Sequence, residues 1–104
     1  MAEQNERKPV FADVTLEEPI ARGETKVETV RLRRPESGEL RGLSMVDIVK
    51  LEVEAIQELL PRISEPKLTD QEVRHLSAPD LFQLSAEIAG FFLPKGMNPA
   101  SLAA

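Results

Sequence analysis

The sequence predicts an α+β fold, with an N-terminal β-hairpin followed by two main amphipathic helices and a short helix between them. Apolar residues alternate with a period of two before residue 34, and they recur at spacings of three and four after residue 43. A Pro-Glu-Ser-Gly turn signal at residues 35–38 separates the two patterns. With 104 residues, the chain suffices for one small domain. We expect that domain to cover residues 10–93, with a flexible tail at 1–9 and a disordered tail at 94–104.

The hairpin is predicted over residues 10–34. Its first strand carries apolar residues on one face, namely Val10, Ala12, Val14 and Leu16. The run 25–33 is rich in β-branched residues, and it places Val30 and Leu32 together on one face of a second strand. The segment 18–23 contains Pro and Gly, and it is predicted to connect the two strands. Because a lone hairpin is marginally stable, we expect it to pack on the helices.

The first main helix is predicted over residues 44–63. Ser44 followed by Asp47 resembles a capping box at its start. The apolar stripe recurs at spacings of four and three, at Val49, Val53, Ile56, Leu60 and Ile63. Pro61 is expected to kink or end this helix.

Two further helices are predicted after Pro66, over residues 69–76 and 79–93. Thr69 with Glu72 resembles a second capping box, at the start of the short helix. Ser77 stands at the position of an N-cap for the final helix. The final helix carries its stripe at Leu81, Leu84, Ile88 and Phe91.

The composition excludes several classes of function. Thirteen Lys and Arg against 18 Asp and Glu give a net charge of −5, which is a poor match to nucleic acid or to an anionic membrane surface. The chain has no Cys and only one His, which argues against disulfides, thiol catalysis and a metal site. It shows no apolar run near the ~20 residues that span a bilayer, and no signal peptide. We therefore expect a cytoplasmic protein without cofactors.

The candidate catalytic residues have simpler interpretations. Glu52, Glu54 and Glu58 fit either an acid–base or metal pair or the solvated face of a helix, and the solvated face is favoured. His75 lacks a second ligand at metal-binding spacing, so it is read as a surface or helix-end histidine.

The one basic cluster leaves three interpretations open. It consists of Arg31, Arg33, Arg34 and Arg41. It could be an exposed strand face paired with nearby glutamates, a docking surface for an acidic partner, or a nucleic-acid surface. Nucleic-acid binding is disfavoured because no aromatic residues are interleaved and no face is broadly basic.

The order of features over residues 10–93 resembles a known family, the small tail assembly chaperones of Mu-like and related contractile-tailed phages and prophages. The segments that carry the resemblance are 32–43 (Leu-Arg-Arg-Pro-Glu-Ser-Gly-Glu-Leu-Arg-Gly-Leu), 59–64 (Leu-Leu-Pro-Arg-Ile-Ser), Leu68-Thr69, Asp80-Leu81 and Phe91-Phe92.

The resemblance implies a non-enzymatic role, with no catalytic residues to carry over. Such proteins hold the long tape measure protein soluble while the tail tube is built around it, so the implied partners are the tape measure protein and the tail tube protein. Some relatives are also made in a longer form by ribosomal frameshifting. The Arg-Pro-x-x-Gly-x-Leu-Arg-Gly segment at 34–42 is expected to fix the passage from hairpin to helix.

The residues themselves also favour a binding protein. The apolar stripes are wider than a small core requires, so part of them is expected to bind a partner or a second copy of the chain. The candidate partner-binding residues are Val49, Val53, Ile56, Leu60, Leu84, Ile88, Phe91 and Phe92. Two alternatives remain: an enzyme subunit, disfavoured by the missing site chemistry, and a structural tail or baseplate adaptor retained in the virion.

Overall fold

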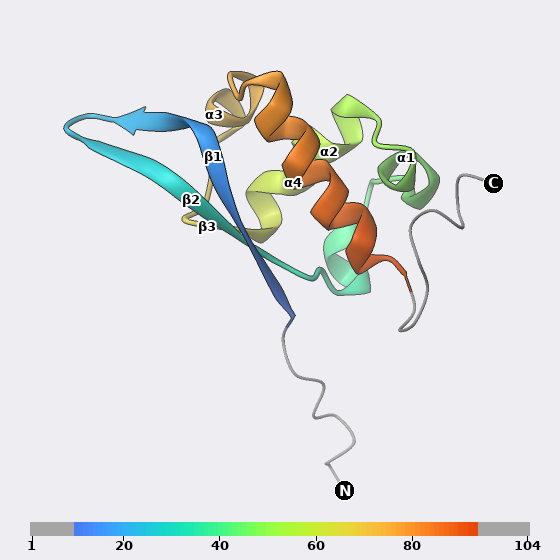
Figure 1. Ribbon diagram of the computed structural model, residues 1–104. Helices are drawn as coiled ribbons and strands as arrows, with labels where there is room; N and C mark the ends of the chain where they lie inside the picture. The colour runs from blue at the N-terminus through green and yellow to red at the C-terminus, as the bar shows by residue number, and fades with distance from the viewer. Residues whose placement is uncertain (1–9, 94–104) are drawn as a thin grey trace, which may run out of the picture.

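The protein folds as an antiparallel hairpin with its helices gathered on one side, so the expected α+β class is confirmed (Figure 1). The computed structural model describes residues 10–93. The tails expected at 1–9 and 94–104 lie outside the described residues. Strand β1 (Phe11–Arg22) pairs with β2 (Thr25–Arg33), and β2 pairs in turn with the two-residue strand β3 (Ser64–Glu65).

The hairpin spans nearly the residues predicted for it, but its first strand runs on to Arg22, so the connection predicted at 18–23 is wrong. The actual loop is Gly23-Glu24, where Gly23 has φ +59°, as the first residue of a tight two-residue turn requires. The pairing register shifts between Thr15 and Ile20, and it resumes at Ile20 opposite Val27. Pro19 lies within this irregular stretch of an edge strand, where a missing ladder N–H costs little.

The prediction of one helix over 44–63 is also wrong, because the chain forms two. Helix α1 (Met45–Val49) ends before α2 (Val53–Ile63) begins, and Leu51 between them has φ 61°. The break turns the two halves relative to each other. As a result Ile48 is buried in α1, whereas Val53 at the start of α2 is 51% exposed.

Pro61 does not end the helix, although the sequence allowed for that outcome. It lies inside α2, which continues for two more residues. The residues that follow are held by other contacts: Ile63 is buried in the core, and Ser64 pairs with Leu32 in the sheet. Tertiary packing of the last turn therefore outweighs the backbone hydrogen bond that proline removes.

The remaining helices begin where the sequence placed their caps. Helix α3 (Asp70–Arg74) starts with a complete capping box between Thr69 and Glu72, and α4 (Ala78–Phe91) starts at Ser77, whose hydroxyl accepts from the Asp80 N–H. Ser44 caps α1 in the same way. A short 3-10 helix, η2 (Ser37–Leu40), was not predicted.

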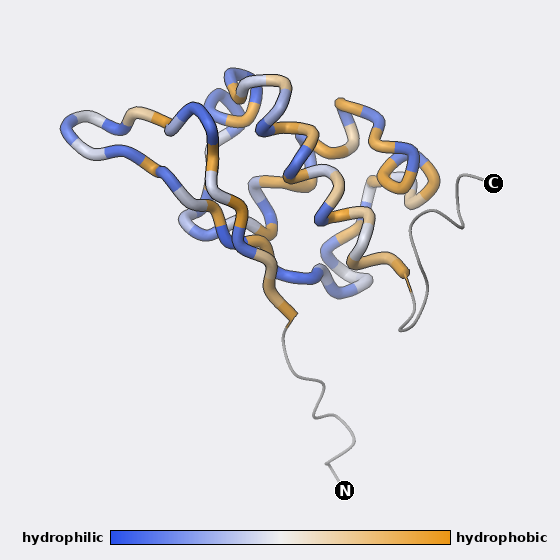
Figure 2. The backbone as a smooth tube through the Cα atoms, viewed as in Figure 1, coloured by the Kyte–Doolittle hydropathy of each residue, from blue (hydrophilic) through white to orange (hydrophobic). Residues whose placement is uncertain are grey.

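The core lies between the hairpin and the helices, and it is aliphatic. Figure 2 shows hydrophobic residues recurring along both the strands and the helices. The apolar faces of the two main strands meet the inner faces of α2 and α4. The buried apolar residues are Val14, Leu16, Val27, Val30, Leu32, Ile48, Ala55, Ile56, Leu59, Leu60, Ile63, Leu68, Val73, Leu84 and Ile88.

A buried carboxylate fixes β1 against α4. Asp80 is fully buried, and its two oxygens accept from the Glu17 N–H at 2.7 Å, the Glu18 N–H at 3.0 Å and the Ser77 hydroxyl at 2.9 Å. Burial by itself raises the pKa of Asp80, but these donors outweigh it and leave the pKa below its ordinary value. The irregular stretch of β1 is thus bonded to the first turn of α4.

Candidate interaction site

The structure divides the eight candidate partner-binding residues into two groups. Four of them pack fully inside the domain's own core: Ile56, Leu60, Leu84 and Ile88. The other four reach the surface, with Val49, Phe91 and Phe92 half-buried and Val53 exposed. In this fold, therefore, only the second group is placed where another molecule can touch it.

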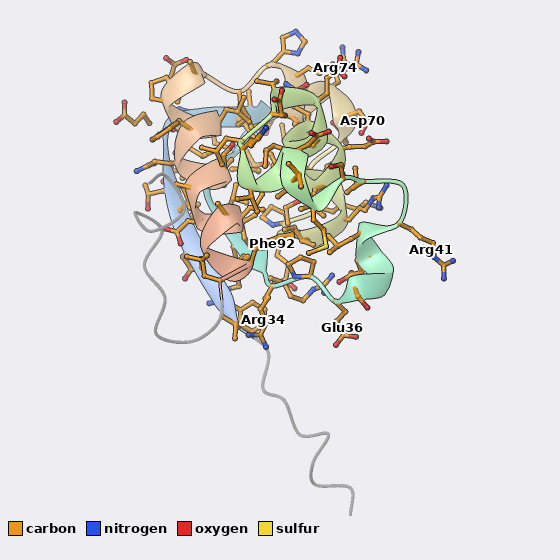
Figure 3. All side chains as sticks on the ribbon, turned by 90° about the vertical axis from the view of Figure 1, so that its right-hand side faces the viewer. Arg34, Glu36, Arg41, Asp70, Arg74 and Phe92 are labelled. Carbon is orange, nitrogen blue, oxygen red and sulfur yellow. The ribbon has the colours of Figure 1, made fainter. Side chains whose placement is uncertain are left out.

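Two of these four residues, Phe91 and Phe92, line a hollow between α1, η2 and the end of α4, which we call the α1–α4 hollow. Its volume is about 210 Å³. Its lining residues are Arg34, Pro35, Ser37, Leu40, Met45, Phe91 and Phe92. Figure 3 faces this side of the molecule, with Phe92 near the centre and Arg34 below it.

The walls of the α1–α4 hollow are firmly supported. Leu40, Phe91 and Phe92 pack against the core from the outside, so their positions follow from the core itself. Met45 is different, because it is 57% exposed at the first position of α1. Its neighbour Val46 is 60% exposed. Of these two exposed side chains, Met45 lines the hollow and Val46 does not.

Four lining residues of the α1–α4 hollow come from the segment 34–42, and hydrogen bonds hold this segment against β2 and α2, as expected for a segment that fixes the passage from hairpin to helix. The Glu39 carboxylate accepts two hydrogen bonds from Arg33, at 2.6 and 2.7 Å, and a third from the Glu36 N–H. The Arg33 bonds are the main reason that the pKa of Glu39 falls to about 2. Arg62 of α2 donates to the carbonyls of Glu39 and Arg41.

The basic cluster is partly neutralised, which is the arrangement expected for an exposed strand face. Arg31 pairs with Asp13 at 2.9 Å and lies over the Phe11 ring, and Arg33 pairs with Glu39. Arg34 makes no ion pair with any residue among 10–93. Arg41 likewise makes no ion pair within this range, and of these two arginines only Arg34 lines the α1–α4 hollow.

Two other hollows are lined mainly by polar and charged side chains. One, between β1 and α3, contains His75 and Glu72, and Glu72 already binds Arg22 and the Thr69 N–H. The Arg22 bonds are the first cause that lowers the pKa of Glu72 to about 2. The other is lined by charged and polar side chains of α2 and α3.

The catalytic candidates remain surface features. The Nδ1 of His75 lies 2.9 Å from the Gln71 carbonyl at the end of α3, where a helix-end histidine was expected. Glu52, Glu54 and Glu58 are exposed. Within residues 10–93 no group of three or more His, Cys, Asp or Glu side chains could hold a metal ion. No helix in this range is long and apolar enough to cross a membrane.

Sequence reasoning missed Leu40, Met45 and Arg34 as parts of the α1–α4 hollow. Leu40 lies in the unpredicted η2, and Met45 lies outside the apolar stripe assigned to the first helix. The Pro-Glu-Ser-Gly turn at 35–38 was the one available signal, because Pro35 and Ser37 of this turn line the hollow together with Met45.

Comparisons with known proteins agree with the resemblance drawn from the sequence. The model of the family described as "phage tail assembly chaperone proteins, E, or 41 or 14" matches residues 13–93. The chain is 42% identical over 85 residues to tail assembly protein E of Escherichia phage P2, which covers 82% of this chain and 93% of that protein.

A second relative from the same phage is longer. Tail assembly protein E′ is 42% identical over 80 residues, which covers 77% of this chain and 56% of that protein. No solved structure matches the chain significantly. The family match spans most of the domain, from the first strand to the end of α4. The chain belongs to the phage tail assembly chaperone family.

Proposed function

We propose that this protein is a non-enzymatic chaperone that binds the tape measure protein in the host cytoplasm and keeps it soluble while the tail tube assembles. Membership of the tail assembly chaperone family supports a role in tail assembly. The more specific proposal, binding of the tape measure protein, rests on the exposed apolar surface at α1, beside a hollow that opens to solvent.

The chemistry of the surface agrees with binding rather than turnover. The α1–α4 hollow is lined by apolar side chains, one hydroxyl and one arginine, a set that offers neither a nucleophile–base pair nor an acid–base pair. Exposed apolar residues grouped at one place are typical of a surface that contacts another protein. A long helical client offers many amphipathic segments for such a surface.

Co-expression tests this proposal. The tape measure protein encoded in the same gene cluster is expressed alone and together with this chain, and its soluble fraction is measured after centrifugation. We expect it to aggregate alone and to remain soluble, and to co-purify, with the chain present. Equal solubility in the two cultures would reject the chaperone function.

The alternative, a tail or baseplate adaptor retained in the virion, predicts a different distribution of the protein. A chaperone should be abundant in the infected cell and absent from purified particles. An adaptor should be present in particles at a fixed ratio to the tube protein. Quantitative mass spectrometry of purified particles distinguishes the two.

A further inference from the structure

The α1–α4 hollow has the size for one large apolar side chain. Its volume is about 210 Å³, and a dry protein cavity of about 150 Å³ binds benzene. Leu40, Phe91 and Phe92 form apolar walls that rest on the core. A Leu, Met or Phe side chain from another molecule therefore fits between them.

The same hollow carries a positive charge in a chain whose net charge is −5. Arg34 is the only charged residue that lines it, and within residues 10–93 this guanidinium has no carboxylate partner. Arg31 and Arg33, in contrast, are both paired. A guanidinium prefers a carboxylate, which it binds through two parallel hydrogen bonds. A molecule that complements this hollow therefore carries a large apolar side chain with an acidic group next to it.

An amphipathic helix supplies both groups from one face. Residues three or four apart on a helix are neighbours, so an apolar anchor and a carboxylate one turn away point to the same side. Met45, which is 57% exposed, gives that helix an apolar contact at the edge of the hollow. Recognition of this kind places a helix in a groove, with anchors at intervals of one turn.

We propose that the α1–α4 hollow binds an acidic amphipathic helix of the tape measure protein, an inference that rests on the function proposed above. One large apolar side chain of that helix enters between Met45 and Phe92, and a carboxylate one turn away pairs with Arg34.

The probe is a set of overlapping 25-residue peptides that tile the tape measure protein, each carrying a fluorophore. Binding to the full-length chain is followed by fluorescence anisotropy. We expect the peptides that bind to share an apolar stripe with Asp or Glu three or four residues from a large apolar residue. If the binding peptides are basic, or lack an apolar stripe, the proposal is overturned.

A matched pair of variants locates the site. Met45→Asp places a charge at the hollow, at the first position of a helix, where an acidic residue is tolerated well. Phe82→Asp adds the same charge at a residue that is 64% exposed and does not line the hollow. We expect Met45→Asp to weaken peptide binding at least tenfold and Phe82→Asp to change it less than twofold. Equal effects of the two variants would overturn the proposal.

A second pair of variants tests whether the positive charge of Arg34 contributes to binding. Arg34→Glu should weaken binding about fivefold, whereas Arg74→Glu, which makes the same change on α3, should have little effect. A peptide whose acidic residue is replaced by Lys should bind Arg34→Glu better than it binds the wild-type chain. If that exchange restores nothing, the carboxylate does not pair with Arg34 and the proposal fails.

Failure here is distinct from failure of the chaperone function. If the tape measure protein is kept soluble by Met45→Asp as well as by the wild type, the function stands and the α1–α4 hollow is not its site. Sedimentation of the free chain provides the other control. A dimer that Met45→Asp dissociates would show that a second copy covers the hollow, which overturns the proposal.

Discussion

Replacing the buried carboxylate of Asp80 by an amide is expected to loosen the junction between β1 and α4. Asp80→Asn keeps the shape of the side chain, but only one of its two terminal atoms can still accept a hydrogen bond. In the wild type, one oxygen accepts from the Glu17 N–H, and the other accepts from the Glu18 N–H and the Ser77 hydroxyl. In the variant, one backbone N–H faces an NH₂ group and loses its acceptor.

The size of the stability loss follows from the backbone N–H group that is left without an acceptor. A hydrogen bond to a charged group contributes about 1.5–3 kcal/mol, and a buried donor without a partner costs about 1–3 kcal/mol. Allowing for local relaxation, we expect Asp80→Asn to lower the free energy of unfolding by about 2–4 kcal/mol. At roughly 4–8 °C per kcal/mol for a domain of this size, the melting temperature should fall by at least about 8 °C.

The chain contains a matched control for this variant. Asp47 occupies the same place in α1 as Asp80 does in α4, three residues after a capping serine. Asp47→Asn therefore removes the same favourable interaction with a helix N-terminus, which is about 0.3–1 kcal/mol. Asp47, unlike Asp80, is exposed and makes no side-chain hydrogen bond to another element among residues 10–93.

Urea unfolding followed by circular dichroism at 222 nm measures both variants, because the chain has no Trp or Tyr for fluorescence. The reasoning requires Asp80→Asn to be clearly more destabilising than Asp47→Asn. If the two variants lose the same small amount of stability, the carboxylate of Asp80 does not hold β1 to α4.

The other predictions concern the core, the ion pairs and the gene. Leu84→Ala should cost about 2–4 kcal/mol because Leu84 is fully buried, whereas Phe82→Ala should lie within about 0.5 kcal/mol of the wild type in the same urea titration. Glu39 and Glu72 have folded-state pKa values of about 2 against an ordinary 4.5, so their stabilisation is complete above pH 4.5 and is lost as the pH falls toward 2. Melting temperatures measured from pH 6 to pH 2.5 should show this decline, and it should be flatter in the Glu39→Gln, Glu72→Gln double variant. If the chain is also made in a longer form, the codons of residues 91–95 should contain a −1 slippage heptamer followed by an open frame, which sequencing of the gene decides.

The signals that predicted the fold correctly are local ones. The caps at Ser44 and Thr69 were predicted from a hydroxyl followed three positions later by an acidic residue, and the cap at Ser77 from its place before the final helix. All three hydroxyls accept the expected backbone hydrogen bond. Alternation correctly predicted that Val14, Leu16, Val30 and Leu32 are buried, but Val10, which was assigned to the same face, is 39% exposed. Such signals act within one helical turn or one strand, so the sequence alone carries them.

The features that could not be predicted depend on contacts between distant elements. Nothing near Leu51 marks a break, because no Gly, Pro or Asn stands there and the apolar spacing runs across it. Pro19 reads as a loop, yet the strand continues because Asp80, more than 60 residues later, satisfies the N–H groups just before it. Tertiary hydrogen bonds of this kind override local preference.

The candidate site shows the same limit. The helical stripes were correctly identified as apolar, but a stripe does not state which of its residues face the domain's own core. Val53 and Ile56 belong to the same predicted stripe and both lie in α2, yet Val53 is 51% exposed and Ile56 is fully buried. The α1–α4 hollow also requires η2 and the end of β2, which only the folded chain brings beside Phe92.

Hydrogen–deuterium exchange of the chain, alone and in complex with the tape measure protein, tests the central claim most directly. The account predicts slower exchange in peptides that cover residues 43–50 and 89–93, on the two sides of the α1–α4 hollow, and unchanged exchange at the hairpin tip around Gly23. Protection confined to the hairpin, or no protection anywhere in a complex that demonstrably forms, would contradict it.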